Sequence, residues 1–351
     1  MANLRRVLVT GANGYVASWI VKQLLEQGVT VHATVRNKSN TDKYQHLLNI
    51  AEKASGTLHV FEADLLETDS FGEAMAGCEV VMHTASPFKL QVDNPQRDLI
   101  NPALQGTENV LNTVNRTPSV QRVVLTSSVA AVYGDNQDIE KTENHIFTEA
   151  HWNTTSSADH QPYYYSKVLA ERRAWQIAEA QDHWDLVTIN PGLVLGPPLS
   201  MQSGSESIKI MQQLTDGTLK MGAPEAYLAL VDIRNVAEAH IVAAQKDEAQ
   251  GRHLLVKEVL SFLQMGEVFR QKYGNKYSVP QWKLPKFVAW LAAPTVGLTR
   301  KYVKRNIGYP IAFDNSKSIE QLGINYIPIA KTLTDHVQAM ERETKEKMAS
   351  A

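Results

Sequence analysis

Cysteine is nearly absent from this sequence: Cys78 is the only one in 351 residues, so no disulfide can form within the chain. That scarcity favours a reducing compartment. The N-terminus lacks the apolar segment and cleavage site of a secretory signal, and the longest apolar stretch, residues 287–298, is too short to cross a bilayer and contains Pro294. We therefore expect a cytoplasmic protein without a membrane span.

The chain also lacks a charge imbalance, since its formal net charge is −2. Nothing in that balance attracts nucleic acid, so we expect no nucleic-acid partner, and we expect no bound metal. The composition, 43% hydrophobic and 21% charged, is ordinary for a globular protein. The length suits one large domain or two smaller ones that share an interface, as a monomer or a homodimer.

Short apolar runs alternate with amphipathic segments in the first half of the chain. The runs predict strands over residues 6–10, 30–35, 58–62, 80–84, 122–126 and 186–190, and the amphipathic segments predict helices over 16–26, 41–52, 70–75, 103–115 and 166–180. This alternation is typical of an α/β fold, a Rossmann-type doubly wound parallel sheet. After Pro191 the alternation stops. We expect residues 1–190 to form mainly the dinucleotide-binding domain, and 191–351 mainly a smaller substrate lobe from which some segments return to the first domain.

A glycine pair follows the first predicted strand and precedes the first predicted helix. Within residues 10–17, Gly11 and Gly14 allow a tight turn and the approach of a pyrophosphate, which the N–H groups at the start of the helix would bind. We expect Asn13, Tyr15 and Val16 to take part in this site. Because the strand–turn–helix context is present, the pattern indicates a dinucleotide site rather than an ordinary turn.

The second predicted strand ends without an acidic residue. An NAD site usually carries Asp or Glu there, whereas residues 29–41 contain none, and Arg36 ends the strand with Lys38 and Lys43 nearby. A guanidinium at that point binds a 2′-phosphate through charge-assisted hydrogen bonds. We therefore expect NADPH/NADP+ as the cofactor. Lys38 and Lys43 have an alternative interpretation as solvated surface charges.

Polar residues also end the third and fourth predicted strands. Asp64 could contact an adenine amino group or cap the next helix, and both interpretations stay open. His83 could act as a catalyst, although a packed strand-end histidine is the simpler interpretation. Ala85 lies just beyond it, at the edge of the sheet where ligands bind in open α/β folds, and we assign it to the cofactor site.

The residues expected to perform chemistry come later. Ser128 follows the fifth predicted strand, and Tyr163 and Lys167 are four residues apart at the start of a helix, so both project from one face. Carbonyl reduction needs a hydride on carbon and a proton on oxygen. A nearby ammonium should lower the pKa of a phenol toward the working range, so Tyr163 is the expected acid, with Lys167 assisting and Ser128 holding the substrate oxygen.

Taken together, these motifs resemble extended short-chain dehydrogenases/reductases, and in particular the dihydroflavonol reductase-like branch that includes yeast methylglyoxal and aldehyde reductases. The resembling stretches run almost from end to end of the chain. Besides those already described they include residues 18–19, 34–36, 63–65, 106–111, 126–128, 163–171, 190–192, 196–197, 231–240 and 314–323.

The resemblance implies that Ser128, Tyr163 and Lys167 are catalytic and that Arg36 and Lys43 bind the 2′-phosphate. It further implies cofactor contacts by Asp64, Leu65, Pro191, Val194 and a serine after Gly196, either Ser205 or Ser207, of which we favour Ser207. Ala103 stands where many members have an asparagine that completes a catalytic tetrad, so the proton path must differ here.

The expected substrate is a small or medium carbonyl compound with an apolar substituent. Phe88, Tyr133, Tyr164 and Tyr227 are the residues expected to face it, and the loops after the fourth and fifth strands offer only Lys89 as a cation. The Asn-Trp-Tyr-Cys-Tyr signature of cinnamoyl-CoA reductases is absent. Alternatives are a sterol or steroid dehydrogenase, a sugar-nucleotide epimerase or dehydratase, and a non-catalytic dinucleotide sensor. Residues 280–309 could form a hydrophobic lid, a membrane-surface helix or an ordinary packing helix.

Overall fold

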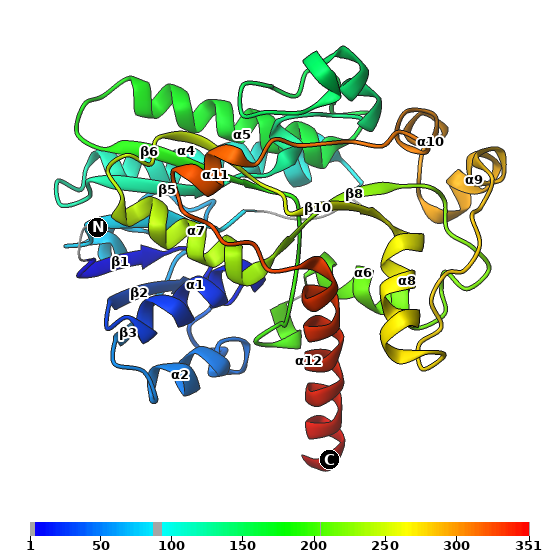
Figure 1. Cartoon of the computed structure of the whole chain (residues 1–351). Coiled ribbons are helices and arrows are strands. Elements are labelled where there is room, and N and C mark those ends of the chain that lie inside the picture. The colour runs from blue at the N-terminus through cyan, green and yellow to red at the C-terminus, as the bar shows by residue number, and fades with distance from the viewer. Residues whose placement is uncertain (1–3, 87–92, 204, 351) are drawn as a thin grey trace.

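A computed structural model describes residues 4–86, 93–203 and 205–350 of the chain. Its main sheet has seven parallel strands in the order β3-β2-β1-β4-β5-β6-β9 (Figure 1). They are β1 (Arg6–Val9), β2 (Thr30–Val35), β3 (Thr57–Glu62), β4 (Val80–His83), β5 (Arg122–Thr126), β6 (Asp185–Pro191) and β9 (Gly251–Leu255). The predicted α/β Rossmann-type fold is confirmed.

Helices cover both faces of this sheet, as its nearly continuous apolar strands require. One layer contains α1 (Tyr15–Glu26), α2 (Gln45–Ala51) and α7 (Ile233–Gln245), and the other contains α3 (Gly72–Met75), α4 (Asn101–Asn115) and α5 (Pro162–Glu179). A π-helical turn (Gln96–Ile100) leads into α4. The two largest hydrophobic clusters of the molecule lie between these layers and the sheet.

The helix predicted over residues 41–52 is divided in two. A short 3-10 turn, η1 (Thr41–Lys43), precedes α2, and the buried Tyr44 separates them with its hydroxyl donating to the carbonyl of Lys38 at 2.7 Å. That contact ties the start of the segment to the loop after β2, so a single continuous helix does not form.

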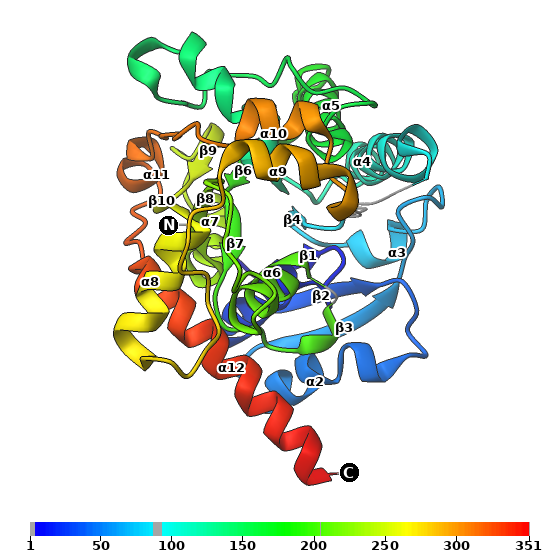
Figure 2. The same ribbon diagram turned by 90° about the vertical axis from the view of Figure 1, so that its right-hand side faces the viewer.

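A smaller mixed sheet lies in the second lobe. Its strands are β7 (Leu193–Leu195), β8 (Tyr227–Asp232) and β10 (Glu258–Ser261); β7 runs parallel and β10 antiparallel to β8. The other helices of this lobe are α6 (Glu206–Thr215), α8 (Phe262–Tyr273), α9 (Lys286–Ala292), α10 (Arg300–Asn306) and α12 (Ile329–Ser350). α11 (Ser316–Glu320) returns to the main sheet, where Lys317 donates to the carbonyls of Gln250 and Arg252. α9 and α10 lie side by side (Figure 2), at the outer margin of this lobe (Figure 1).

β9 is the one strand of the main sheet that the sequence did not predict. The chain leaves β6, builds β7, α6, β8 and α7, and then returns to pair β9 with β6. Of the described residues, none belongs to a helix long and apolar enough to cross a membrane.

Candidate active site

The turn between β1 and α1 has the geometry of a phosphate-binding loop. Gly11 has a φ of +63°, and a Cβ atom added to it would lie 3.0 Å from the Cβ of Ala85. A Cβ atom on Gly14 would lie 3.1 Å from the Gly11 carbonyl oxygen. Helix α1 begins at Tyr15 without a side-chain cap. The backbone N–H groups of Tyr15 and Val16 therefore stand at the positive end of α1, where a pyrophosphate fits.

Thr10 and His83 hold Ala85 against this turn. The Thr10 hydroxyl accepts from the backbone N–H groups of Thr84 and Ala85 at 3.1 and 3.0 Å, so its own hydrogen is directed to Nδ1 of His83 at 2.9 Å. Burial, and then the charge of Lys167, lowers the pKa of His83 to about 3. His83 is thus a neutral structural residue at the end of β4, in line with the simpler of its two interpretations.

Arg36, Asp64 and Leu65 come together beyond the ends of β2 and β3. The Arg36 side chain is 82% exposed, and its Nε lies 3.7 Å from a carboxylate oxygen of Asp64. Asp64 also accepts from the backbone N–H of Leu66 at 2.9 Å, while the Leu65 carbonyl accepts from Asn109 at 2.8 Å. The cation of Arg36, the carboxylate of Asp64 and the apolar side chain of Leu65 therefore lie in one region, beyond the ends of β2 and β3. Lys43 lies on η1, exposed and farther along the loop.

Ser128, Tyr163 and Lys167 meet at the carboxyl edge of the main sheet. Ser128 follows β5, and Tyr163 and Lys167 project from the first turns of α5. Ser128 hydrogen-bonds the Tyr163 hydroxyl. The Lys167 ammonium lies 5.9 Å from the centre of the Tyr163 ring and donates to the Ser86 hydroxyl at 3.3 Å. The structure thus brings together the three side chains expected to be catalytic.

Burial is the largest influence on the pKa values of Tyr163 and Lys167. It raises the pKa of Tyr163 well above its usual value, although the hydrogen bond with Ser128 opposes the rise. The expectation that Lys167 brings this pKa down toward neutrality is therefore not met in the structure, because burial and then the neighbouring Tyr164 raise the pKa of Tyr163. At neutral pH Tyr163 retains its proton, as a general acid requires. Burial also lowers the pKa of Lys167 to about 8, against the opposing charge of Glu171.

Glu171 lies one turn beyond Lys167 on α5 and joins three strands of the sheet. Its carboxylate accepts from Ser127 at the end of β5, from Asn190 on β6 at 2.7 Å, and from Arg252 on β9 at 2.6 Å. The Glu171 side chain is fully buried, and that of Arg252 is only 8% exposed. This buried ion pair fixes the position of α5, and so of Tyr163 and Lys167, relative to Ser128.

The remaining residues assigned to the cofactor lie around the second sheet. Pro191 ends β6, Val194 is buried on β7, and Ser205 caps α6 by accepting from the N–H of the buried Ser207 at 3.2 Å. The Tyr15 hydroxyl donates to the carbonyl of Gly196 at 2.6 Å. Tyr15 therefore ties the glycine turn to the loop after β7.

Aromatic rings line the other side of Tyr163. Tyr164 lies against it at 6.1 Å between ring centres, and Tyr133 packs on Tyr164 at 5.8 Å and hydrogen-bonds it. Burial raises the pKa of Tyr133, and the nearby Tyr164 and Tyr302 of α10 add to the rise. Tyr227 instead donates its hydroxyl to Glu225 at 3.0 Å. Phe88 lies outside the described residues.

A second buried carboxylate, Asp135, attaches α10 to this aromatic cluster. Asp135 is 1% exposed and lies 2.9 Å from Nε2 of His160, 2.7 Å from the amide of Asn306 and 3.2 Å from Arg305. His160 comes three residues before Tyr163. Sequence reasoning missed Asp135, His160, Asn306 and Tyr302. Asn306 and Asp135 are 171 residues apart, and even His160 and Asp135 are 25 residues apart, so no local pattern links them. Sequence reasoning also missed the role of Glu171, which its helical spacing from Tyr163 and Lys167 could have indicated.

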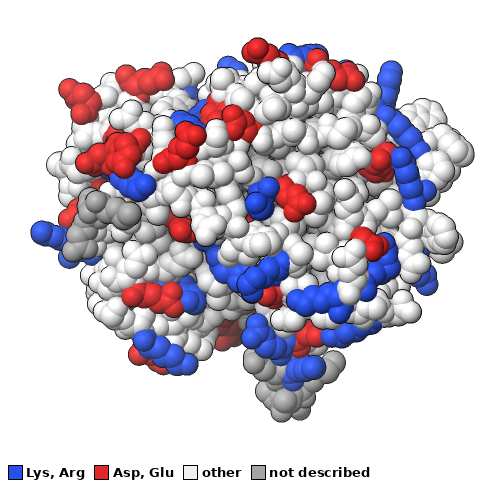
Figure 3. All heavy atoms as spheres, viewed as in Figure 1, with Lys and Arg blue, Asp and Glu red and all other residues white. Residues whose placement is uncertain are grey.

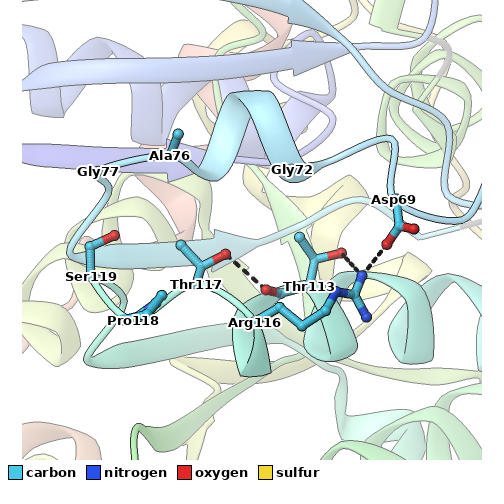
Figure 4. A pocket seen from close by; sticks show the side chains of 9 residues that line it. All are labelled: Asp69, Gly72, Ala76, Gly77, Thr113, Arg116, Thr117, Pro118 and Ser119. Atoms are coloured by element: carbon cyan, nitrogen blue, oxygen red, sulfur yellow. Dashed lines mark hydrogen bonds and ion pairs between the residues drawn. The ribbon is translucent and has the colours of Figure 1, made fainter.

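A surface hollow elsewhere in the molecule does not belong to this site. It lies at the C-terminal end of α4, where Arg116 donates to Asp69 and Thr113 (Figure 4). β5 begins shortly after that end of α4. The hollow is therefore at the amino edge of the sheet, opposite Ser128 and Tyr163.

Comparison with known proteins agrees with this geometry. The model of the family described as "NAD dependent epimerase/dehydratase family" matches residues 7–256. The chain is 36% identical to a cinnamoyl-CoA reductase of Medicago truncatula (96% of both chains) and 31% identical to an anthocyanidin reductase of Arabidopsis thaliana (91% of this chain, 93% of the other).

Solved structures of similar proteins give the same result. A yeast methylglyoxal/isovaleraldehyde reductase, Gre2, complexed with NADPH superposes with a TM-score of 0.75 at 27% identity, over 97% of this chain and 99% of that one. Gre2 of Candida albicans in complex with NADPH gives 0.77 at 28%, over 96% and 99%. The chain therefore belongs to the NAD dependent epimerase/dehydratase family of extended short-chain dehydrogenases/reductases, as an NAD(P)-dependent reductase of the branch that contains the dihydroflavonol and cinnamoyl-CoA reductases and Gre2.

Proposed function

We propose that this protein reduces an aldehyde or ketone to the alcohol with NADPH, using Tyr163 as the general acid. The observation that carries the proposal is the meeting of Ser128, Tyr163 and Lys167 at the carboxyl edge of the sheet, beside the glycine turn. Bound NADPH supplies the hydride that adds to the carbonyl carbon.

The chain's own residues then act on the carbonyl oxygen. Ser128 and the Tyr163 hydroxyl hold that oxygen by hydrogen bonds, and Tyr163 transfers its proton to the oxygen as negative charge develops there. The nearby Lys167 ammonium stabilises the phenolate that remains. The carbon has gained a hydride and the oxygen a proton, so the products are an alcohol and NADP+.

The proposed cofactor contacts extend from the glycine turn to the second lobe. Arg36 would bind the 2′-phosphate, because it directly follows β2 and residues 29–41 around it contain none of the acidic residues that an NAD site usually carries there. The relatives solved with NADPH support the same choice. The full proposed set is Gly11, Asn13, Gly14, Tyr15, Val16, Arg36, Lys43, Asp64, Leu65, Ala85, Tyr163, Lys167, Pro191, Val194 and Ser207.

The aromatic rings beside Tyr163 support an apolar carbonyl substrate of small or medium size. Tyr133, Tyr164 and Tyr302 offer ring faces and hydroxyl groups but no cation that would hold a phosphate or carboxylate. An apolar pocket discriminates weakly, by about 1–3 kcal/mol for each methylene. We therefore expect turnover of a range of aryl and alkyl carbonyl compounds.

The test follows NADPH absorbance with a panel of aldehydes, ketones, diketones and ketoesters. Wild-type protein should oxidise NADPH with several of them, Tyr163→Phe should lose turnover while still binding NADPH, and Tyr165→Phe should remain active as the matched control on the same helix. Activity in Tyr163→Phe would contradict the assigned acid. Turnover restricted to one sugar nucleotide or one acyl-CoA would contradict the substrate class.

A further inference from the structure

Exposed apolar side chains are concentrated on one part of the surface. Ten large apolar residues are exposed in the described part of the chain, and seven of them fall at position 221 or within residues 282–298. The largest exposed fractions belong to Met221 (83%), Trp282 (70%), Phe287 (67%) and Val296 (64%); the other three are Trp290, Leu291 and Leu298. A concentration of this kind marks an interaction surface more often than isolated apolar residues do.

Contacts between the segments show that these residues occupy a common surface, here called the α9–α10 face. The chain around Met221 runs beside that around Trp282, since the N–H of Ala223 donates to the carbonyl of Trp282 at 3.0 Å. The Arg300 guanidinium lies 4.4 Å from the centre of the Trp290 ring, which joins the start of α10 to α9. The Lys286 ammonium donates to the carbonyl of Lys304 at 3.0 Å and joins the other ends of the two helices.

The same face is strongly basic. Residues 276–313 contain seven Lys and Arg residues and no Asp or Glu, in a protein whose net charge is −2. Three of the seven are neutralised: Lys276 by Glu341, Lys283 by Glu225, and Arg305 by Asp135. The other four, which form no ion pair with any described residue, are Lys286, Arg300, Lys301 and Lys304. Figure 3 shows basic side chains beside uncharged surface where α9 and α10 stand in Figure 1.

The exposed apolar residues are not the lining of the active site. The inward side of α9 and α10 is already filled, because Ala289, Ala293 and Val303 pack on Ala226 and Ile307. Tyr302 and Asn306 also point inward, toward Tyr164 and Asp135. The basic residues and the large apolar residues named above are left on the outer side. The two short helices are therefore amphipathic, with the inner side used for packing and the outer side uncovered.

We propose that the α9–α10 face binds the surface of an anionic lipid membrane. Tryptophan, phenylalanine and leucine side chains would enter the boundary between headgroups and acyl chains, while the four unpaired cations would contact anionic headgroups. Exposed apolar side chains alone, or cations alone, give weak membrane binding, and this face combines the two. A second copy of this chain fits less well, because a two-fold interface would place the four cations of one protomer against those of the other.

Binding is tested by flotation of the purified, NADPH-loaded protein with two kinds of vesicle. One is pure phosphatidylcholine, and the other contains about one quarter phosphatidylserine. We expect binding to the anionic vesicles that weakens as salt is added, and little binding to the neutral ones. Trp282→Ser with Phe287→Ser, and separately Lys301→Gln with Lys304→Gln, should each reduce the apparent affinity about tenfold or more.

The matched control is Leu66→Ser with Ile319→Ser, which removes two exposed apolar residues elsewhere on the molecule. It should bind like the wild type, and melting temperature confirms that each variant is folded. The proposal is overturned if the wild type does not bind anionic vesicles, or if the control and the α9–α10 variants lose binding equally. It is also overturned if Trp282→Ser with Phe287→Ser converts a dimer to a monomer, because the face would then join two copies of the chain.

Discussion

At the scale of single residues, Arg36 shows how a surface side chain acquires a defined position. β2 ends at Val35, so the next side chain extends beyond the sheet, and Asp64 from the neighbouring strand end lies 3.7 Å away. At 82% exposure this ion pair contributes little to stability. The role that we propose for it is to direct the Arg36 guanidinium toward the 2′-phosphate of the bound cofactor.

Replacing Arg36 should therefore change cofactor choice more than stability. Loss of a charge-assisted contact costs about 1.5–3 kcal/mol, which corresponds to a tenfold to hundredfold weaker interaction. We expect Arg36→Gln to raise the KM for NADPH by that factor and to leave the KM for NADH unchanged. Lys53→Gln, which alters an exposed cation beyond α2, serves as the control. Equal use of NADH and NADPH by the wild-type protein would contradict the assignment.

At the scale of elements, α5 carries Tyr163 and Lys167, and its position depends on Glu171. The carboxylate of Glu171 is shared among residues of β5, β6 and β9, so one side chain sets the distance between the helix and the ends of three strands. The arrangement requires the charge of Arg252 beside it. Removing one partner of such a pair leaves an uncompensated charge in the interior.

We expect Glu171→Gln to destabilise the fold by about 3–5 kcal/mol because it leaves the buried Arg252 unpaired. kcat should fall as well, since Tyr163 and Ser128 lose their fixed separation. Glu171→Met combined with Arg252→Met should recover much of the stability, and Glu179→Gln at the exposed end of the same helix is the control. Denaturant unfolding and kcat are measured together. If Glu171→Gln is as stable and active as the control, the ion pair does not position α5.

The same residues explain where sequence reasoning succeeded and where it failed. The six predicted strands are apolar runs with a β-type pattern, and each was found close to its observed bounds. β9 was missed because Arg252 and His253 interrupt its apolar pattern. The buried arginine is stabilised by Glu171, 81 residues earlier, and by the carbonyls of Glu149 and His151, about 100 residues earlier. The four-residue spacing of Tyr163 and Lys167 on α5 is local, so the sequence alone shows it. The contacts of Asp135 with His160 and Asn306 depend on tertiary packing, so no local pattern predicts them.

At the scale of the whole molecule, four buried histidines make the fold sensitive to acid. His83, His240, His253 and His336 are at most 2% exposed, and burial lowers their pKa values to about 3, 4, 4 and 3. The unfolded chain binds protons at these groups near pH 6.5, whereas the folded protein does not. Folding is therefore favoured above pH 6.5, and this stability is lost as the pH falls toward 4.

The free energy of unfolding should thus fall steeply with pH between 6.5 and 4.5. Four such groups give a slope of at most about 5 kcal/mol per pH unit. In His240→Gln the slope should be smaller by about one quarter, since one of the four groups is removed. His59→Gln changes an exposed histidine and should leave the slope as it is. Denaturant titrations across this range provide the measurement, and a pH-independent stability would contradict the explanation.

The late return of the chain to the main sheet affects how the protein emerges from the ribosome. β6 is complete at Pro191, but its outer neighbour β9 is not synthesised until residues 251–255, after most of the second lobe. During that interval the outer edge of β6 has no partner strand, and Glu171 lacks its ion-pair partner Arg252. Newly made protein should therefore need chaperones most while these roughly 60 residues are being translated.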